Sequence, residues 1–247
     1  MKKEYFHFIR ESASSDARLF CFHYAGGSPY TYAVWQKYIA EDIDVFPFQM
    51  AGHCGRRCEK CSRSIEDAAR EAAHEISRFT DKRILFTGHS MGGVLAYYTA
   101  YLLKKHHGIT VEKLFITASL PDLGSCIRYE YGSSEKYSDE DFSKMLMEFG
   151  AVDTKVADMK IFKEKFLPLI RSDFSLIEKY HADPHNVIDS DITVFCGDCD
   201  KIVGRAECSE WKRYTSGNVS IKEYSGDHFF IKQHIQEICA SINQCVV

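Results

Sequence analysis

The chain has 247 residues, of which 45% are hydrophobic and 13% aromatic, and this is enough for one large core in a single domain with an insertion. Its formal net charge of −4 argues against a nucleic-acid-binding surface. No window approaches the ~18 apolar residues of a membrane span, and the N-terminal apolar patch is too short and too charged for a secretory signal, so a cytoplasmic location is expected.

Six short apolar or alternating runs predict β-strands. In chain order they cover residues 18–23, 43–48, 83–87, 113–118, 192–196 and 219–224. Helical patterns lie between the earlier strands, over residues 28–40, 64–79 and 91–107. Ser28 and Pro29 supply the N-cap and first-turn proline of the first of these helices. The alternation predicts an α/β fold with a mostly parallel sheet and helices on both faces.

One segment, from about residue 121 to 189, contains no convincing strand. Ser138 and Asp141 form a helix-start signature before one apolar stripe, and a second stripe over residues 162–177 is interrupted by Pro168. A helical insertion between two strands predicts a lid on a single domain that spans residues 1–247. Ordinary core helices are the alternative, and the two interpretations are compatible if they apply to opposite helix faces.

The pentapeptide Gly88-His89-Ser90-Met91-Gly92 lies where a strand turns into a helix. Such a G-x-S-x-G turn forces strained backbone angles on the serine, and glycines two positions away remove the resulting clashes. The turn presents Ser90 at the carboxyl end of the sheet, where ligands of such folds bind. The alternative is a glycine-rich helix start that only packs tightly.

A nucleophilic serine needs a base and an acid, which follow it in the order acid, then histidine, in folds with this turn. His228 follows the last predicted strand, whereas His181, His185 and His234 are its rivals. For the acid, the strand over 192–196 runs into Gly197-Asp198-Cys199-Asp200. The spacing favours Asp200, and Asp198 is the alternative. The predicted catalytic residues are therefore Ser90, Asp200 and His228.

Acyl transfer also requires N–H donors for the oxyanion. The backbone N–H of Met91, directly after the nucleophile, is one expected donor. The glycine-containing loop of residues 23–27 offers a second, and the Ala25 N–H is our choice. Taken alone, this glycine pair could form only a tight turn.

Cys58-x-x-Cys61 and Cys196-x-x-Cys199 have the spacing of a four-thiolate zinc site. In the predicted sheet, however, the two pairs follow strands four places apart, roughly 19 Å at ~4.8 Å per strand. We expect reduced, packed thiols and no bound metal. The alternative is a local site made of His53, Cys54, Cys58 and Cys61.

Taken together, these motifs resemble the type II thioesterases associated with non-ribosomal peptide and polyketide synthases, which have the α/β-hydrolase fold. The resemblance covers nearly the whole chain. It is carried by residues 19–28, Tyr32, Trp35, Gly52, Arg56, Glu59, residues 88–93, 166–174 and 226–230. Three positions depart from the family pattern: His23 and Ala51 replace prolines, and His53 replaces an arginine. Whether His23 displaces the oxyanion donor or reaches into the site is left open.

This resemblance implies an editing hydrolase that cleaves acyl thioesters from the phosphopantetheine arm of acyl or peptidyl carrier domains. Ser90 would attack, His228 would transfer the proton, and Asp200 would orient His228. No cofactor is expected beyond the pantetheine of the substrate, and the expected partners are carrier domains, with no nucleic acid or membrane, for a monomeric enzyme. A small-molecule esterase or lipase with the same triad is the runner-up, and a non-catalytic carrier-binding protein is a third hypothesis.

Overall fold

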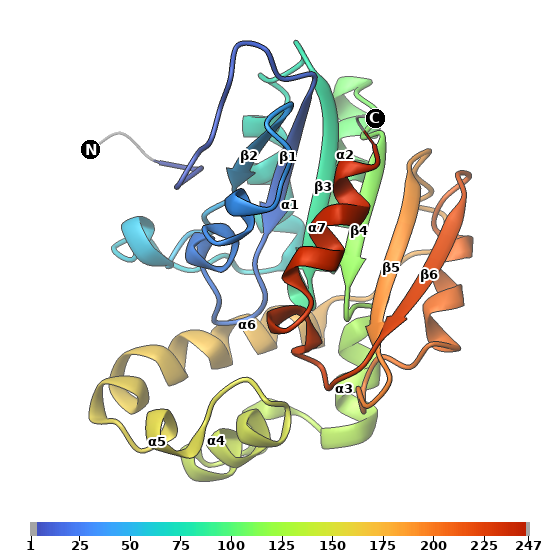
Figure 1. Cartoon of the computed structure of the whole chain (residues 1–247). Coiled ribbons are helices and arrows are strands. Elements are labelled where there is room, and N and C mark those ends of the chain that lie inside the picture. The colour runs from blue at the N-terminus through green and yellow to red at the C-terminus, as the bar shows by residue number, and fades with distance from the viewer. Residues whose placement is uncertain (1–3, 246–247) are drawn as a thin grey trace.

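The computed structural model describes residues 4–245, which contain one six-stranded sheet in the order β2-β1-β3-β4-β5-β6. Its strands are β1 Ala17–Phe22, β2 Ile43–Pro47, β3 Arg83–His89, β4 Lys113–Thr117, β5 Asp191–Gly197 and β6 Val219–Tyr224. Every neighbouring pair is parallel. The predicted α/β fold with a mostly parallel sheet is confirmed. All carboxyl ends therefore lie along one edge of the sheet (Figure 1).

Helices cover both faces of this sheet (Figure 1). Helices α1 (Ile65–Ile76) and α2 (Met91–His107) contribute apolar side chains to the larger buried cluster. Helix α7 (Ile235–Asn243) packs on the opposite face with the short helices η1 (Pro29–Tyr32) and η2 (Trp35–Lys37). Further short helices are η3 Cys54–Arg56, η6 Glu207–Arg213 and η7 Phe230–Lys232.

The prediction of one helix over residues 28–40 is wrong, because two short helices, η1 and η2, form there instead. Ser28 is extended, but its side chain makes no capping hydrogen bond. Thr31 and Val34 are β-branched, which disfavours a longer α-helix. The buried Tyr32 instead fixes this segment by donating its hydroxyl hydrogen to the carbonyl oxygen of Phe22 at 2.6 Å.

The segment between β4 and β5 is helical, and we call residues 123–179 the lid segment. Its elements are α3 Leu123–Tyr131, η4 Ser134–Lys136, α4 Asp139–Glu148, α5 Thr154–Ala157, η5 Phe162–Phe166 and α6 Leu167–Lys179. The predicted cap is present, with the Asp141 N–H donating to the Ser138 hydroxyl at 3.1 Å. Pro168 lies in the first turn of α6, directly after the π-helical turn η5, so regular α-helix is interrupted next to the proline as expected. The lid segment lies beyond the carboxyl ends of the strands (Figure 1).

The cysteine pairs lie apart, as the strand order requires. Cys58 and Cys61 follow β2, whereas Cys196 and Cys199 lie at the end of β5, four positions away in the sheet. Within residues 4–245, no three His, Cys, Asp or Glu side chains lie together in a way that could hold a metal ion. In the same range, no helix combines the length and the apolar character needed to cross a membrane.

Candidate active site

The turn between β3 and α2 gives Ser90 a positive φ of 54° with a ψ of −120°, outside the regions that residues with a side chain usually adopt. A Cβ atom on Gly88 would lie 2.1 Å from the Gly92 carbonyl oxygen, and one on Gly92 would lie 2.0 Å from that of Phe22. Neither position can hold a larger residue without moving backbone. The two glycines therefore permit the strained turn that presents the Ser90 hydroxyl.

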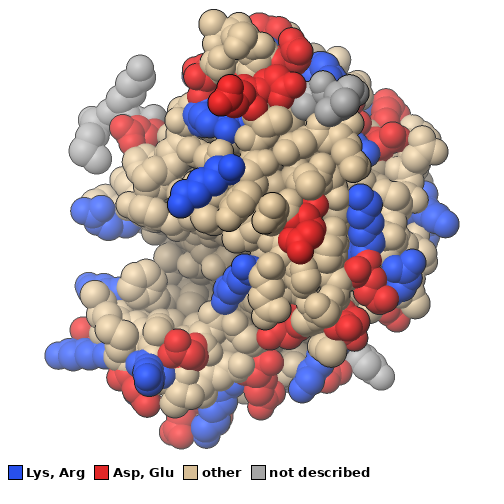
Figure 2. Space-filling model, viewed as in Figure 1, with Lys and Arg blue, Asp and Glu red and all other residues tan. Residues whose placement is uncertain are grey.

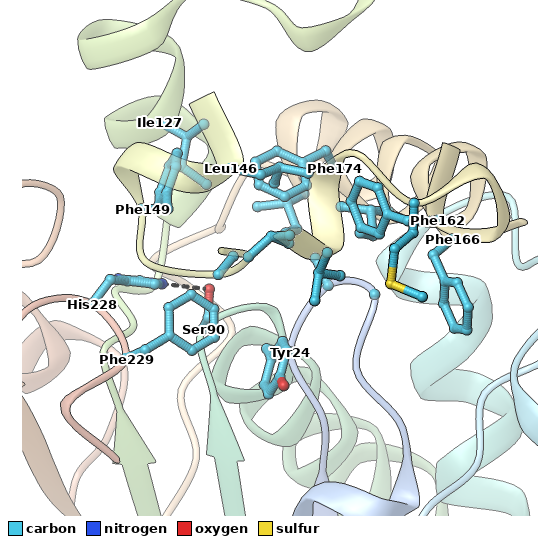
Figure 3. A pocket seen from close by; sticks show the side chains of 18 of the residues that line it. Tyr24, Ser90, Ile127, Leu146, Phe149, Phe162, Phe166, Phe174, His228 and Phe229 are labelled. Carbon is cyan, nitrogen blue, oxygen red and sulfur yellow. Dashed lines mark hydrogen bonds between the residues drawn. The ribbon is translucent and has the colours of Figure 1, made fainter. Parts of the chain in front are cut away.

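The structure brings together the three predicted catalytic side chains. The Ser90 hydroxyl lies 2.9 Å from His228 Nε2, as the dashed line in Figure 3 marks. On the other side of the ring, His228 Nδ1 lies 2.8 Å from Asp200 Oδ2. His228 comes from the loop after β6, and Asp200 comes from the loop after β5. This is the geometry of a nucleophile, a base and an orienting acid.

The Asp200 carboxylate is fully buried. Burial alone would raise the pKa of Asp200, but its attraction to His228 and the hydrogen bonds it accepts hold that pKa below the usual value. Two of these bonds come from the backbone N–H groups of Ile202 and Val203, which donate to Oδ1 at 2.9 and 3.2 Å. Asp200 is therefore ionised while it faces His228.

The rival residues lie elsewhere. Asp198 accepts a hydrogen bond from the Gly226 N–H at 2.9 Å. It thereby shapes residues 226–230, which we call the histidine loop, without facing the His228 ring nitrogens. His181 and His185 are exposed, and His234 contacts the Ser225 carbonyl oxygen at 3.0 Å. Among the histidines weighed from the sequence, His228 is the one in hydrogen-bond contact with Ser90.

Residues 23–27, which we call the oxyanion loop, form a closed turn beside Ser90. The Gly27 N–H donates to the Tyr24 carbonyl oxygen at 2.8 Å. Ala25 and Ser90 line the same cavity. Met91 is the first residue of α2, and N–H groups in the first turn of a helix have no intrahelical acceptor. Both predicted oxyanion donors thus belong to segments that border Ser90.

The question left open for His23 has a structural answer. Its Nδ1 lies 2.9 Å from the Tyr24 carbonyl oxygen, and its ring packs against that of His53 with centroids 4.7 Å apart. His23 therefore turns into the protein beneath the oxyanion loop. His53 contacts Asp173 of α6, and Asp173 also accepts a hydrogen bond from the Gly26 N–H at 2.7 Å. No local sequence pattern signals this contact, because Gly26 and Asp173 lie 147 positions apart.

A cavity of about 320 Å³ opens beside Ser90. Its walls are mainly aliphatic and aromatic, and they come from the oxyanion loop, the lid segment and the histidine loop. Figure 3 labels Tyr24, Ser90, Ile127, Leu146, Phe149, Phe162, Phe166, Phe174, His228 and Phe229 around it. Ser90 and His228 lie at one end of this row of side chains, and Phe162 and Phe166 lie at the other (Figure 3). An apolar chain attached to a reacting carbonyl fits such a cavity.

Comparison with known proteins agrees with this geometry. A family model described as a thioesterase domain matches residues 17–245. The chain belongs to the thioesterase domain family. This thioesterase is 27% identical over 231 residues to thioesterase PikA5 of Streptomyces venezuelae, covering 93% of this chain and 81% of that protein. It is 26% identical to the gramicidin S biosynthesis protein GrsT of Aneurinibacillus migulanus, and the match covers 94% of this chain and 90% of GrsT.

A solved structure is also similar to this thioesterase. RedJ, a thioesterase from the prodiginine biosynthetic pathway in Streptomyces coelicolor, is 26% identical, with a TM-score of 0.82 over 94% of this chain and 91% of RedJ. The resemblance found in the sequence is thereby confirmed, and the protein is a hydrolase that acts on thioesters.

Proposed function

We propose that this thioesterase removes acyl groups from the phosphopantetheine arms of carrier domains, as an editing hydrolase of a peptide or polyketide synthase. The observation that carries the proposal is the apolar cavity at Ser90, enclosed by the lid segment. The relatives support a biosynthetic setting, because RedJ is named for the prodiginine biosynthetic pathway and GrsT for gramicidin S biosynthesis. The substrate would bring its own pantetheine, so the reaction needs no separate cofactor.

In the proposed reaction, His228 Nε2 takes the Ser90 hydroxyl proton while Oγ attacks the thioester carbonyl carbon. The N–H groups of Ala25 and Met91 stabilise the oxyanion of the tetrahedral intermediate. Its collapse breaks the carbon–sulfur bond, and the thiolate leaves with the proton from His228. Water, deprotonated by the same nitrogen, then attacks the acyl-serine ester. The acid is released, and Ser90 regains its proton.

The lining of the cavity favours an uncharged, largely hydrocarbon acyl group. Among the residues that border it, none is Asp, Glu, Lys or Arg, and His228 is the one ionisable group besides Tyr24. A buried carboxylate or ammonium on the substrate would find no opposite charge there. Val156, Met159, Ile161 and Phe166, at the outer part of the lining, remain 39% to 55% exposed, so they also offer an apolar surface at the entrance.

Basic side chains border this entrance. Residues 154–166 carry four lysines against one aspartate and one glutamate, and all four lysines are exposed. Figure 2 shows a hollow between the lid segment and the rest of the molecule, with Lys and Arg side chains on both of its rims. A positive rim attracts the phosphate of a phosphopantetheine arm. The charge pattern thus supports a carrier-bound substrate.

A hydrolysis panel tests this proposal. Matched octanoyl groups would be presented on a carrier domain, on free pantetheine and as an oxygen ester, with kcat/KM measured for each. We expect the carrier thioester to be the best substrate and the oxygen ester to be the poorest. A clear preference for the oxygen ester would instead favour the esterase alternative. Equal rates on carrier-bound and free pantetheine thioesters would argue against carrier recognition.

A further inference from the structure

The lid segment is joined to the oxyanion loop by a buried pair, His53 and Asp173. His53 follows β2, and Asp173 lies on α6. Both residues are 1% exposed. One carboxylate oxygen of Asp173 lies 3.2 Å from His53 Nε2, and the other accepts the hydrogen bond from the Gly26 N–H. One side chain of the lid segment therefore touches the loop that carries the Ala25 N–H.

The two contacts of the His53 ring require a proton on the pair. Nδ1 lies 3.0 Å from the Gly27 carbonyl oxygen, which can only accept, and Nε2 faces the Asp173 carboxylate. A neutral imidazole has one N–H donor, whereas an imidazolium has two. Removing the proton therefore leaves one of these oxygens, on the oxyanion loop or on α6, facing a lone pair.

The surrounding charges do not supply a substitute for this proton. His23, packed against His53, has its pKa lowered to about 4 by burial and by His53, so its ring is neutral. Arg56 of η3 is held by the carboxylates of Glu59 and Glu71. Burial lowers the pKa of His53, but Asp173 and the Gly27 carbonyl oxygen outweigh that effect and raise it above the usual 6.5.

We propose that the His53–Asp173 pair holds α6 against the oxyanion loop only while it carries a proton, and that Asp173 is thereby a positioning residue for the Ala25 N–H. The packing makes this contact sensitive to small shifts. A Cβ atom on Gly26 would lie 2.3 Å from Ile170 Cγ1, also on α6. The inference rests on the proposed role of the oxyanion loop in thioester hydrolysis.

The direction in which pH changes the contact between α6 and the oxyanion loop follows from the raised pKa of His53. The contact is complete at pH values below the usual 6.5 and is lost as the pH rises through the raised value. Activity should therefore fall on the alkaline side with the loss of one proton. Because loss of a whole oxyanion donor costs about 10²- to 10³-fold in rate, a displaced donor should lower kcat/KM by about tenfold or more.

Three variants test this dependence through the pH profile of kcat/KM on an octanoyl-pantetheine thioester, corrected for spontaneous hydrolysis. His53→Arg keeps a permanent positive charge, and we expect its alkaline fall to disappear. Asp173→Asn keeps an oxygen for the Gly26 N–H but removes the charge, so its alkaline fall should move to lower pH. His185→Arg is the matched control, because His185 forms an exposed pair with Asp183 at 2.8 Å, and its profile should equal that of the wild type.

Hydrogen–deuterium exchange of the unmodified protein provides a readout that does not depend on turnover or on the variants folding. After correction for intrinsic exchange, peptides from the oxyanion loop and from α6 should lose protection together as the pH rises, whereas peptides from α2 should not. Unchanged protection, or the same alkaline fall in wild type and folded His53→Arg, would overturn the inference. Failure of the proposed function would appear separately, as absent thioesterase activity with pH-dependent protection intact.

Discussion

Replacing Asp200 with asparagine changes one atom, and the structure determines which way the new amide points. The backbone N–H groups of Ile202 and Val203 both donate to Asp200 Oδ1. In Asp200→Asn, the amide oxygen must take that position, which places the NH₂ group against His228 Nδ1. Nδ1 then accepts a hydrogen bond, so the ring proton moves to Nε2. The nitrogen that faces Ser90 can no longer accept the hydroxyl proton.

The expected loss in kcat is about 10⁴-fold, the size seen when a triad histidine is held in the wrong tautomer, or ~5.5 kcal/mol of transition-state stabilisation. Asp198→Asn is the matched control. The Asp198 side chain accepts from the Gly226 N–H, and an amide oxygen can do the same, so its cost should stay within about one net hydrogen bond, ~1 kcal/mol or about fivefold.

The assay is the release of thiol from an acyl-pantetheine substrate, followed with a thiol-reactive dye. The protein has ten free cysteines, so the enzyme must be far below the substrate concentration, and a blank without substrate must be subtracted. Thermal unfolding checks that both variants fold. The reasoning is refuted if Asp200→Asn keeps more than about a tenth of wild-type kcat, or if the control variant loses as much activity as Asp200→Asn.

Four further predictions concern the nucleophile, its turn, the cavity and acid stability. Ser90→Ala should reduce turnover by about 10³-fold or more with little change in melting temperature, and an active Ser90→Ala would remove Ser90 from the mechanism. Gly92→Ala should cost about 3 kcal/mol or more in urea unfolding, because its Cβ would lie 2.0 Å from the Phe22 carbonyl oxygen; an unchanged midpoint would contradict the strained-turn account. Phe166→Ser should lower kcat/KM for long acyl chains by about fivefold, from ~1 kcal/mol of lost apolar contact, and should spare acetyl substrates; equal losses on both would argue against an acyl cavity. The pKa of Asp200 is lowered in the folded protein, so ionised Asp200 stabilises the fold fully above its unfolded pKa near 3.8, and this stabilisation is lost as the pH falls through the lowered pKa. On acidification, the free energy of unfolding should therefore fall more steeply for wild type than for Asp200→Asn. Parallel curves of unfolding free energy against pH would contradict this.

The sheet could be predicted because each strand is a short apolar run bounded by turn residues. The predicted strand ends lie within two residues of the observed ones. Helix α2 was predicted with its observed ends, since Ser90 and Gly108 bound it. The segment after Ser28 was mispredicted for a physical reason. Its start signals are those of an α-helix, but tertiary contacts of Tyr32 fix two short helices instead.

The triad could be predicted because its members follow the ends of β3, β5 and β6, in a fixed order along the chain. Local patterns carry no information about side chains that meet across the fold. The contacts of Asp173 with Gly26 and His53 join residues far apart in the sequence, and so does the packing of His23 against His53. From the sequence alone, His23 and His53 are only departures from the family pattern, which has a proline and an arginine at these positions. The structure shows that their rings pack against each other and that His53 contacts Asp173 of the lid segment.

The central claim is that Ser90 accepts the acyl group from a thioester. Rapid mixing with octanoyl-pantetheine, acid quenching and mass spectrometry of the digested protein measure this directly. The account predicts one octanoyl group on the peptide that contains Ser90, linked as an oxygen ester and absent from Ser90→Ala. An octanoyl group found instead on an exposed thiol such as Cys58 or Cys199, with turnover intact in Ser90→Ala, would contradict it.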